Sequence, residues 1–231
     1  MKIKLLSRLF VGLVAGLLII GPVMTTRTQT NQAQAHEIVN LAKLRGMVWQ
    51  VKRVDGGWAS AVVISPSHAI TAGHVVAGLT DNLTVGLVLI HPITGDEYPV
   101  WVVKSEYSGE MDGMDIAILK PVFGIFPSPY ASLREDIPAV DEQVVSIGYP
   151  LAPQINNLQF ATYGNWQGLY SNHYALISTP ITFGNSGGGT FDAQGRLVGL
   201  TVAGAGTRYG PVGYITFITR ADSIIEYITS K

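Results

Sequence analysis

Short strand-like segments separated by turn residues fill the chain from Gly46 onward, and this pattern constrains the fold more than any other feature. The segments are rich in Val, Ile, Tyr and Trp, which suit a pleated, half-buried surface. A helical period appears only over residues 221–228, where Ile224, Ile225 and Ile228 share one face. We therefore expect an all-β body that ends in a short C-terminal helix. The predicted strands cover residues 47–54, 59–65, 83–90, 98–106, 116–121, 143–149, 158–168, 174–179, 189–191, 197–202 and 214–219.

A stretch that contains proline and glycine divides these strands into two groups. Residues 122–138 carry Pro127, Pro129 and Pro138 and show no alternation of apolar and polar side chains. Such a stretch is typical of a connection between domains. The sequence therefore predicts two β-rich halves joined by this connection.

The N-terminus has the features of an export signal. Lys2, Lys4 and Arg8 precede an uncharged stretch over residues 9–24, and small residues at both ends of 33–35 form a cleavage site for a signal peptidase. Two outcomes stay open: cleavage after this site, or retention of the uncharged stretch as a membrane anchor with its basic end inside. In both cases we expect the body of the protein to be exported, either to a periplasm or to the extracellular space.

The composition excludes several kinds of site. The chain has no cysteine, which rules out disulfides, a thiolate zinc site and a cysteine nucleophile. Charged residues are only 13% of the chain, the formal net charge is -1, and no run of Lys or Arg follows the N-terminus. Because nucleic-acid binding needs a basic surface, we expect no nucleic-acid partner.

Three short motifs supply the groups that a serine nucleophile needs. His74 follows Thr-Ala-Gly at the end of an apolar run, Asp115 directly precedes the apolar residues 116–119, and Ser186 lies in the sequence GNSGG. A serine hydroxyl is a weak nucleophile, so it requires a base and a group that orients the base. The flanking glycines would allow the N–H groups of Gly184 and Ser186 to point at a developing oxyanion.

Chain order separates two classes of hydrolase. The sequence GNSGG also satisfies G-x-S-x-G, the nucleophile elbow of α/β-hydrolases, in which the histidine follows the serine. That order is absent here, and the helical crossovers of a parallel sheet are missing as well, so the α/β-hydrolase fold is excluded. The five histidines all precede Ser186: His36, His68, His74, His91 and His173.

Two choices among these residues follow from their surroundings. Asp112 lies three residues before Asp115, and we favour Asp115 because it directly precedes an apolar strand. A histidine beside apolar residues is usually structural, so we assign no chemistry to His68, His91 or His173.

The three motifs resemble the TAGH, DIAxL and G(D/N)SGG motifs of the trypsin-like (chymotrypsin-fold) serine proteases, in the same order. The resemblance implies two antiparallel β-barrels and a serine endopeptidase without metal or cofactor. It implies His74 as base, Asp115 as its orienting carboxylate, Ser186 as nucleophile, and the N–H groups of Gly184 and Ser186 as oxyanion hole. The domains would be residues 1–35 as signal peptide or anchor, 36–45 as a pre-domain segment, 46–121 as first barrel, 122–138 as connection, and 139–231 as second barrel with the C-terminal helix.

The chain departs from the digestive members of that family at Asn185. They carry there an aspartate that binds the new N-terminus after zymogen cleavage, and an amide cannot form this ion pair. GNSGG is closest to bacterial HtrA/Deg-type protease domains, although only 45 residues follow Ser186, so that we expect a protease domain without a PDZ domain. The family also suggests a hydrogen bond between Thr201 and Asp115.

The same resemblance predicts where a peptide substrate binds. Pro180 and Phe183 would line the pocket for the residue before the scissile bond, and Val202, Ala203 and Gly204 would pair with the substrate backbone as an added strand. These segments contain no acid or base, so a charged substrate side chain would find no counter-charge, and we expect an uncharged preference.

Two other functions are compatible with this fold. One is a catalytically silent peptide-binding module of the cell envelope, against which the intact set of His74, Asp115 and Ser186 argues. The other is an esterase or acyltransferase. The function that the motifs favour is cleavage of protein or peptide substrates.

Overall fold

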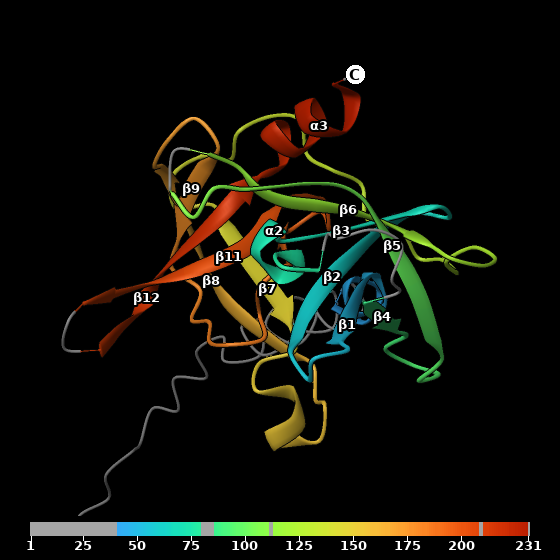
Figure 1. Ribbon diagram of the computed structural model, residues 1–231. Coiled ribbons are helices and arrows are strands. Elements are labelled where there is room, and N and C mark those ends of the chain that lie inside the picture. Colours follow the sequence, from blue (N-terminus) through green and yellow to red (C-terminus); the bar gives the residue numbers. More distant parts are fainter. Residues whose placement is uncertain (1–40, 80–85, 111–112, 208–209, 231) are drawn as a thin grey trace, which may run out of the picture. The chain divides into compact units, whose positions relative to one another are not determined.

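Two closed antiparallel β-barrels, each of six strands, form the described part of the chain (Figure 1). The computed structural model describes residues 41–79, 86–110, 113–207 and 210–230. Both barrels belong to one compact unit, Val39–Lys231. The expectation of an all-β, two-barrel fold with a short C-terminal helix is confirmed.

The first barrel closes in the order β1-β2-β3-β6-β5-β4. β3 was not predicted as a separate strand, because its four residues follow β2 after a tight turn. Residues 41–47, which precede the barrel, are helical. The predicted strand at 83–90 begins outside the described residues, and its observed part is β4. The strands are β1 (Val48–Arg53), β2 (Trp58–Ser65), β3 (His68–Thr71), β4 (Leu87–Ile90), β5 (Glu97–Tyr107) and β6 (Asp115–Pro121), with the helical turn α2 (Gly73–Val76) after β3.

The second barrel closes in the order β10-β11-β12-β9-β8-β7. β11 and β12 are longer than predicted, because they continue as a two-stranded ribbon that ends with Thr207 paired to Gly210. This extension was not predicted, because glycines interrupt the strand-like pattern in β11. The elements are β7 (Gln143–Gly148), the 3-10 turn η1 (Ala152–Ile155), β8 (Phe160–Leu169), β9 (Tyr174–Ile177), β10 (Gly189–Asp192), β11 (Leu197–Thr207), β12 (Gly210–Arg220) and the helix α3 (Ala221–Thr229).

Strand β6 shows why several strands are apolar on both faces. Ala117 and Leu119 are buried in the core of the first barrel. Ile116 and Ile118, which alternate with them, are buried in a second cluster that also contains Phe191 from β10 of the other barrel. Because successive strand residues face opposite sides, a strand between the two cores reads as a continuous apolar run. The second cluster joins the barrels, and the cleft described below lies where they meet.

A cluster of charged residues around the buried Arg134 and Asp192 ties the connection between the barrels to the β10–β11 hairpin. The Arg134 guanidinium, which is 7% exposed, forms ion pairs with Asp136 at 2.7 Å, with Asp192 at 3.3 Å and with Glu142. The fully buried Asp192 carboxylate also binds Arg196 at 2.8 Å. Hydrogen bonding to Arg134 lowers the pKa values of Asp136 and Glu142. Arg134 is therefore the centre of this cluster.

The predicted export signal lies outside the described residues, and it stays a prediction. None of the helices in the described ranges is long and apolar enough to cross a membrane.

Replacing Arg134 with Met should lower the free energy of unfolding by about 3 kcal/mol at pH 7, because the buried Asp192 loses a partner. The pKa of Glu142 is lowered in the folded protein, so its contribution is present above the unfolded value of 4.5 and is lost as the pH falls through the folded value. The difference between wild type and variant should therefore shrink below pH 4.5. Urea unfolding of both proteins between pH 7 and pH 3 measures this difference in unfolding free energy.

Arg45 provides the control, because its side chain is exposed. Arg45→Met should change the free energy of unfolding by no more than about 0.5 kcal/mol. A loss in Arg134→Met that is equally large at both ends of the pH range would contradict the role of the ion pairs.

Candidate active site

His74 and Asp115 are joined by two hydrogen bonds. The main-chain N–H of His74, on α2, donates to Oδ1 of Asp115 at 2.8 Å, and the ring Nδ1 lies 2.7 Å from Oδ2. The Asp115 side chain is only 8% exposed. Because Nδ1 donates its hydrogen to a carboxylate, Nε2 keeps its lone pair, as a general base requires. Asp112, the alternative carboxylate, lies outside the described residues.

Asp115 is also held by the second barrel. The buried hydroxyl of Thr219 on β12 donates to the main-chain carbonyl of Asp115 at 3.0 Å. The prediction of a hydrogen bond between Thr201 and Asp115 is wrong: none joins them in the described structure. Thr201 lies on β11, one strand away from Thr219 on β12. Its main chain instead exchanges hydrogen bonds with residues 183–188, the nucleophile loop. The Thr201 N–H donates to the Gly188 carbonyl at 2.8 Å, and the Thr201 carbonyl accepts from the Gly187 N–H at 2.7 Å. The family resemblance predicted that β11 would supply the hydroxyl next to Asp115, whereas β12 supplies it.

Two glycines beside Ser186 are required by the close approach of the barrels. Gly184 has a φ of +98°, and a Cβ there would lie 2.8 Å from the Trp58 ring of the first barrel and 2.2 Å from the main-chain oxygen of Tyr149. Gly187 has a φ of +79°, and a Cβ there would lie 2.2 Å from the main-chain oxygen of Ser60. Any other residue at these two positions would have a strained backbone and a Cβ too close to its neighbours. The glycines of GNSGG therefore allow the loop to pack against the first barrel.

The peptide between Phe183 and Gly184 has a fixed orientation. The Phe183 carbonyl accepts a hydrogen bond from the Leu151 N–H at 2.8 Å. In a trans peptide the N–H points away from the carbonyl, so the Gly184 N–H points away from Leu151. Within the described residues, neither the Gly184 N–H nor the Ser186 N–H has a hydrogen-bond partner. The described structure thus leaves both of these main-chain donors without a partner.

Ser60, on β2, is a residue of the site that the sequence analysis missed. It is fully buried, and its N–H donates to the Ser186 carbonyl at 2.8 Å. Its hydroxyl donates to the Gly184 carbonyl at 2.8 Å and accepts from the Tyr149 N–H at 2.9 Å. One side chain of the first barrel therefore holds the nucleophile loop of the second. A serine within the apolar strand WASAVVIS was the available signal.

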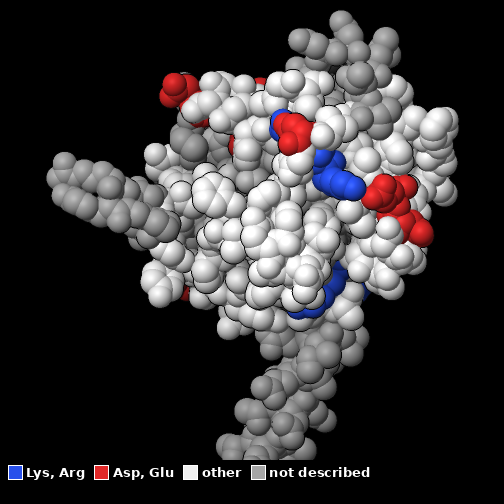
Figure 2. All heavy atoms as spheres, turned by 60° about the horizontal axis from the view of Figure 1, so that its bottom comes forward, with Lys and Arg blue, Asp and Glu red and all other residues white. Residues whose placement is uncertain are grey.

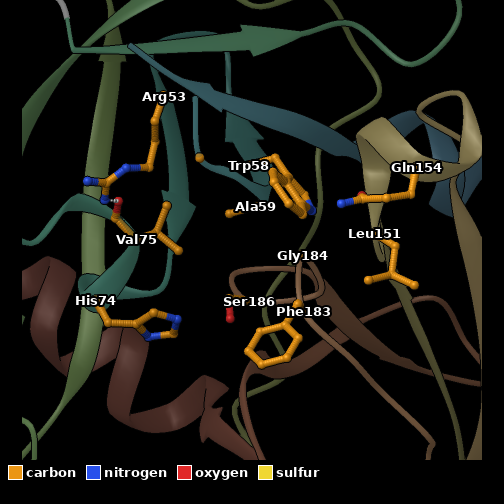
Figure 3. Close-up of a pocket in the computed structure, with 11 residues that line it drawn as sticks. Arg53, Trp58, Ala59, His74, Val75, Leu151, Gln154, Phe183, Gly184 and Ser186 are labelled. Atoms are coloured by element: carbon orange, nitrogen blue, oxygen red, sulfur yellow. Dashed lines mark hydrogen bonds between the residues drawn. The ribbon is translucent and has the colours of Figure 1, made fainter. Parts of the chain in front are cut away.

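Ser186 and His74 line a common hollow of about 440 Å³ (Figure 3). Within the described residues, no hydrogen bond joins the His74 ring to the Ser186 hydroxyl. Such bonds tighten in many enzymes only when substrate binds. The ring of Tyr107, on β5, also packs against His74, with 5.7 Å between the ring centroids. The hollow is lined by Arg53, Gly57, Trp58, Ala59, His74, Val75, Leu151, Gln154, Phe183, Gly184 and Ser186.

The residues predicted to pair with the substrate backbone lie on an open edge of β11. β11 pairs with β12 through Ala203 and Gly204, whereas its last residue paired with β10 is Leu200. In the described structure, the edge beyond Leu200 that faces away from β12 has no neighbouring strand. The side chain of Val202 is buried, and that of Pro180 is exposed. The substrate-binding roles of these residues stay predictions.

Three other histidines do not line the hollow in the described structure. His68 Nδ1 lies 2.9 Å from the Ser67 hydroxyl, and the His91 ring packs edge-on against Trp49 with centroids 4.7 Å apart. Burial lowers the pKa values of His68 and His91. His173 Nδ1 is buried without a hydrogen-bond partner in the described residues. These positions fit structural roles. Within the described ranges, no group of three or more His, Asp or Glu side chains could hold a metal ion.

The two barrels and the histidine, carboxylate and serine at their junction define the class of trypsin-like serine endopeptidases. Residues 59–200 match the model of the trypsin-like peptidase domain family. The chain belongs to this family. A comparison with curated protein sequences gives no match.

Solved structures share the fold at low sequence identity. The Rv3671c protease from M. tuberculosis in its active form is 19% identical, with a TM-score of 0.65 over 81% of each chain. The HtrA-type protease AlgW with a tripeptide is 23% identical, with a TM-score of 0.66 over 83% of this chain and 62% of that chain. The serine endoprotease from Yersinia pestis is 19% identical, with a TM-score of 0.63 over 82% of this chain and 64% of that chain. The chain thus spans less than two thirds of the last two proteins.

Replacing Ser60 with Ala should lower both stability and turnover. The buried Gly184 carbonyl and Tyr149 N–H would lose their partner, which costs about 1–3 kcal/mol of unfolding free energy. The Gly184 peptide would also be less well fixed, so kcat should fall more than KM changes. Urea unfolding and hydrolysis of a peptide substrate measure the two effects.

Ser67→Ala is the matched control, since Ser67 is an exposed serine in the turn after β2. It should alter neither quantity appreciably. If Ser60→Ala unfolds and turns over like the wild type, Ser60 does not hold the nucleophile loop.

Proposed function

We propose that this chain hydrolyses peptide bonds through an acyl-enzyme on Ser186, with His74 as general base and Asp115 as the carboxylate that orients it. The observation that carries the proposal is the pair of hydrogen bonds that the buried carboxylate of Asp115 accepts from the main-chain N–H and the ring of His74. The ring is thereby oriented in a hollow that it shares with Ser186.

Acylation needs a proton acceptor and a site for the negative charge. Ser186 Oγ attacks the scissile carbonyl carbon as His74 Nε2 takes the hydroxyl proton, and Asp115 stabilises the imidazolium that forms. The N–H groups of Gly184 and Ser186 donate to the oxyanion, and loss of one such donor typically costs about 3 kcal/mol of transition-state stabilisation. His74 then gives the proton to the leaving amine, and a water molecule repeats the sequence to release the acyl group.

The acyl half of the substrate binds as a strand on the open edge of β11. Val202, Ala203 and Gly204 supply its backbone partners, and Pro180 and Phe183 lie near the side chain before the scissile bond. The absence of acidic and basic residues in segments 180–183 and 201–206 supports an uncharged preference there. We also propose that the protein is exported, on the evidence of its N-terminal sequence.

A fluorophosphonate probe should label the wild type, because the probe reacts with an activated serine. Ser186→Ala should abolish labelling, and Asp115→Asn should reduce peptide hydrolysis by about 10⁴-fold, since the ring would lose the carboxylate that sets its tautomer. Intact-protein mass spectrometry and a fluorogenic peptide measure the two effects.

Ser67→Ala should retain full labelling, because this serine is exposed and outside the hollow. Folded wild type that takes up no probe would instead support a catalytically silent peptide-binding module. Labelling that persists in Ser186→Ala would place the nucleophile elsewhere.

Digestion of a peptide library should give cuts after uncharged residues, because a charged side chain at that position would be buried without a partner. Cleavage after Lys, Arg, Asp or Glu should be at least about 10-fold slower. Sequencing of the products by mass spectrometry measures the preference. Dominant cleavage after a charged residue would overturn the uncharged pocket while leaving the assignment of Ser186 intact.

A further inference from the structure

The hollow at Ser186 lies apart from the edge of β11. Its lining residues come from the end of β1 and the start of β2, from α2, from η1 and the residue before it, and from the nucleophile loop. In Figure 3, the side chains of His74 and Ser186 lie toward one side of the hollow, and those of Leu151 and Gln154 lie toward the other. The hollow therefore begins at the reacting groups and extends toward η1.

This position identifies which half of a substrate covers the hollow. The two halves of an extended peptide leave the scissile carbonyl in opposite directions. In the proposed function the backbone of the acyl half pairs with residues 202–204 of β11, which contribute nothing to the hollow's lining, and of the residues given to the acyl side only Phe183 also borders the hollow. The half that follows the scissile bond must then run over the hollow.

Large apolar side chains surround the hollow. Phe183 is 83% exposed and Leu151 is 38% exposed, and the Trp58 ring, which also lines the hollow, lies next to Gly184. Single exposed apolar residues are ordinary, but several around one concave site are typical of a binding site. An apolar ligand side chain would cover these surfaces and remove them from water.

Charge in the hollow is already neutralised. Arg53 lines the hollow, but its guanidinium binds Asp55 at 2.6 Å and also donates to the Val75 carbonyl. Hydrogen bonding to Arg53 lowers the pKa of Asp55 to about 2, so this carboxylate is ionised at neutral pH. Figure 2, which brings the η1 side of the molecule forward, shows mostly uncharged residues. An acidic ligand would find no free cation here.

The rim of the hollow is held in place before substrate arrives. Leu151 has a φ of +48°, which is uncommon for a residue other than glycine. Its N–H binds the Phe183 carbonyl at 2.8 Å, and its own carbonyl accepts from the Gln154 N–H at 2.8 Å. Leu151 therefore belongs both to the apolar rim and to the support of the Gly184 peptide.

We infer that this hollow binds the first residues after the scissile bond and selects a bulky apolar side chain there, aromatic or large aliphatic. The inference rests on the proposed function, because it takes Ser186 as the acylated residue. It adds a second determinant of specificity, on the leaving-group side, to the uncharged pocket on the acyl side.

Acyl transfer tests this site separately from the acyl side. A short peptide ester with an uncharged acyl part acylates Ser186, and amino-acid amides then compete with water. The amine nitrogen bonds to the acyl carbon, the bond from that carbon to Ser186 Oγ breaks, and the proton of the amine passes through His74 to Oγ. The amides of Phe and Leu should capture the acyl group at least about 10-fold better than those of Gly, Asp or Lys.

Two leucine variants of the β7–β8 connection provide the matched comparison. Leu151→Asn removes an apolar wall and keeps a residue that tolerates positive φ, so the ratio of Phe-amide to Gly-amide capture should fall several-fold. Leu158 is an exposed leucine outside the hollow, and Leu158→Asn should leave the ratio unchanged.

The outcomes separate the inference from the proposed function. If the ester is not turned over, the proposed function fails and the inference fails with it. If hydrolysis is normal but all amides capture equally, or if the Asp or Lys amide is preferred, the inference alone is overturned. Preference for Phe and Leu that is lost in Leu151→Asn and kept in Leu158→Asn supports it.

Discussion

The contact between Ser60 of the first barrel and the nucleophile loop of the second is the interaction on which the site depends. Two atoms of the buried Ser60 make three hydrogen bonds. Its N–H donates to the Ser186 carbonyl, and its hydroxyl donates to the Gly184 carbonyl and accepts from the Tyr149 N–H. Burial excludes water as an alternative partner, so the loop has one favoured position. The distance between the His74 ring and the Ser186 hydroxyl is thus set by the packing of the two barrels.

The cores explain why that packing is well defined. Strands such as β6 bury alternate residues in their own barrel and in the cluster shared with the other barrel. A shift of one barrel against the other would expose apolar side chains on one side and create voids on the other. The same junction carries His74 on α2 and Asp115 on β6, and the Thr219 hydroxyl reaches Asp115 from the second barrel. Catalytic geometry and barrel association therefore depend on the same residues.

The sequence was sufficient for the fold class and for the groups of the candidate site, for a physical reason. Alternating apolar residues and turn residues are local signals, and TAGH and GNSGG are short motifs whose order along the chain excludes an α/β-hydrolase. The pairing of His74 with Asp115 could be proposed from the motifs because each flanks a strand.

What the sequence did not reveal depends on contacts between distant segments. Ser60 was passed over because its partners lie 89 and 124 residues away. Thr219 was missed in favour of Thr201, since only the three-dimensional arrangement shows that β12 reaches Asp115. The hollow beside Leu151 combines segments from both barrels, and its apolar character is not visible in any one of them.

The most direct measurement of the central claim is the site of the covalent intermediate. An ester that acylates quickly and deacylates slowly would be incubated with the protein, and the modified residue located by peptide mapping with mass spectrometry. We expect one acyl group per chain, on Ser186, and none in His74→Ala on the same timescale. An acyl group on another residue, or equal acylation of wild type and His74→Ala, would contradict it.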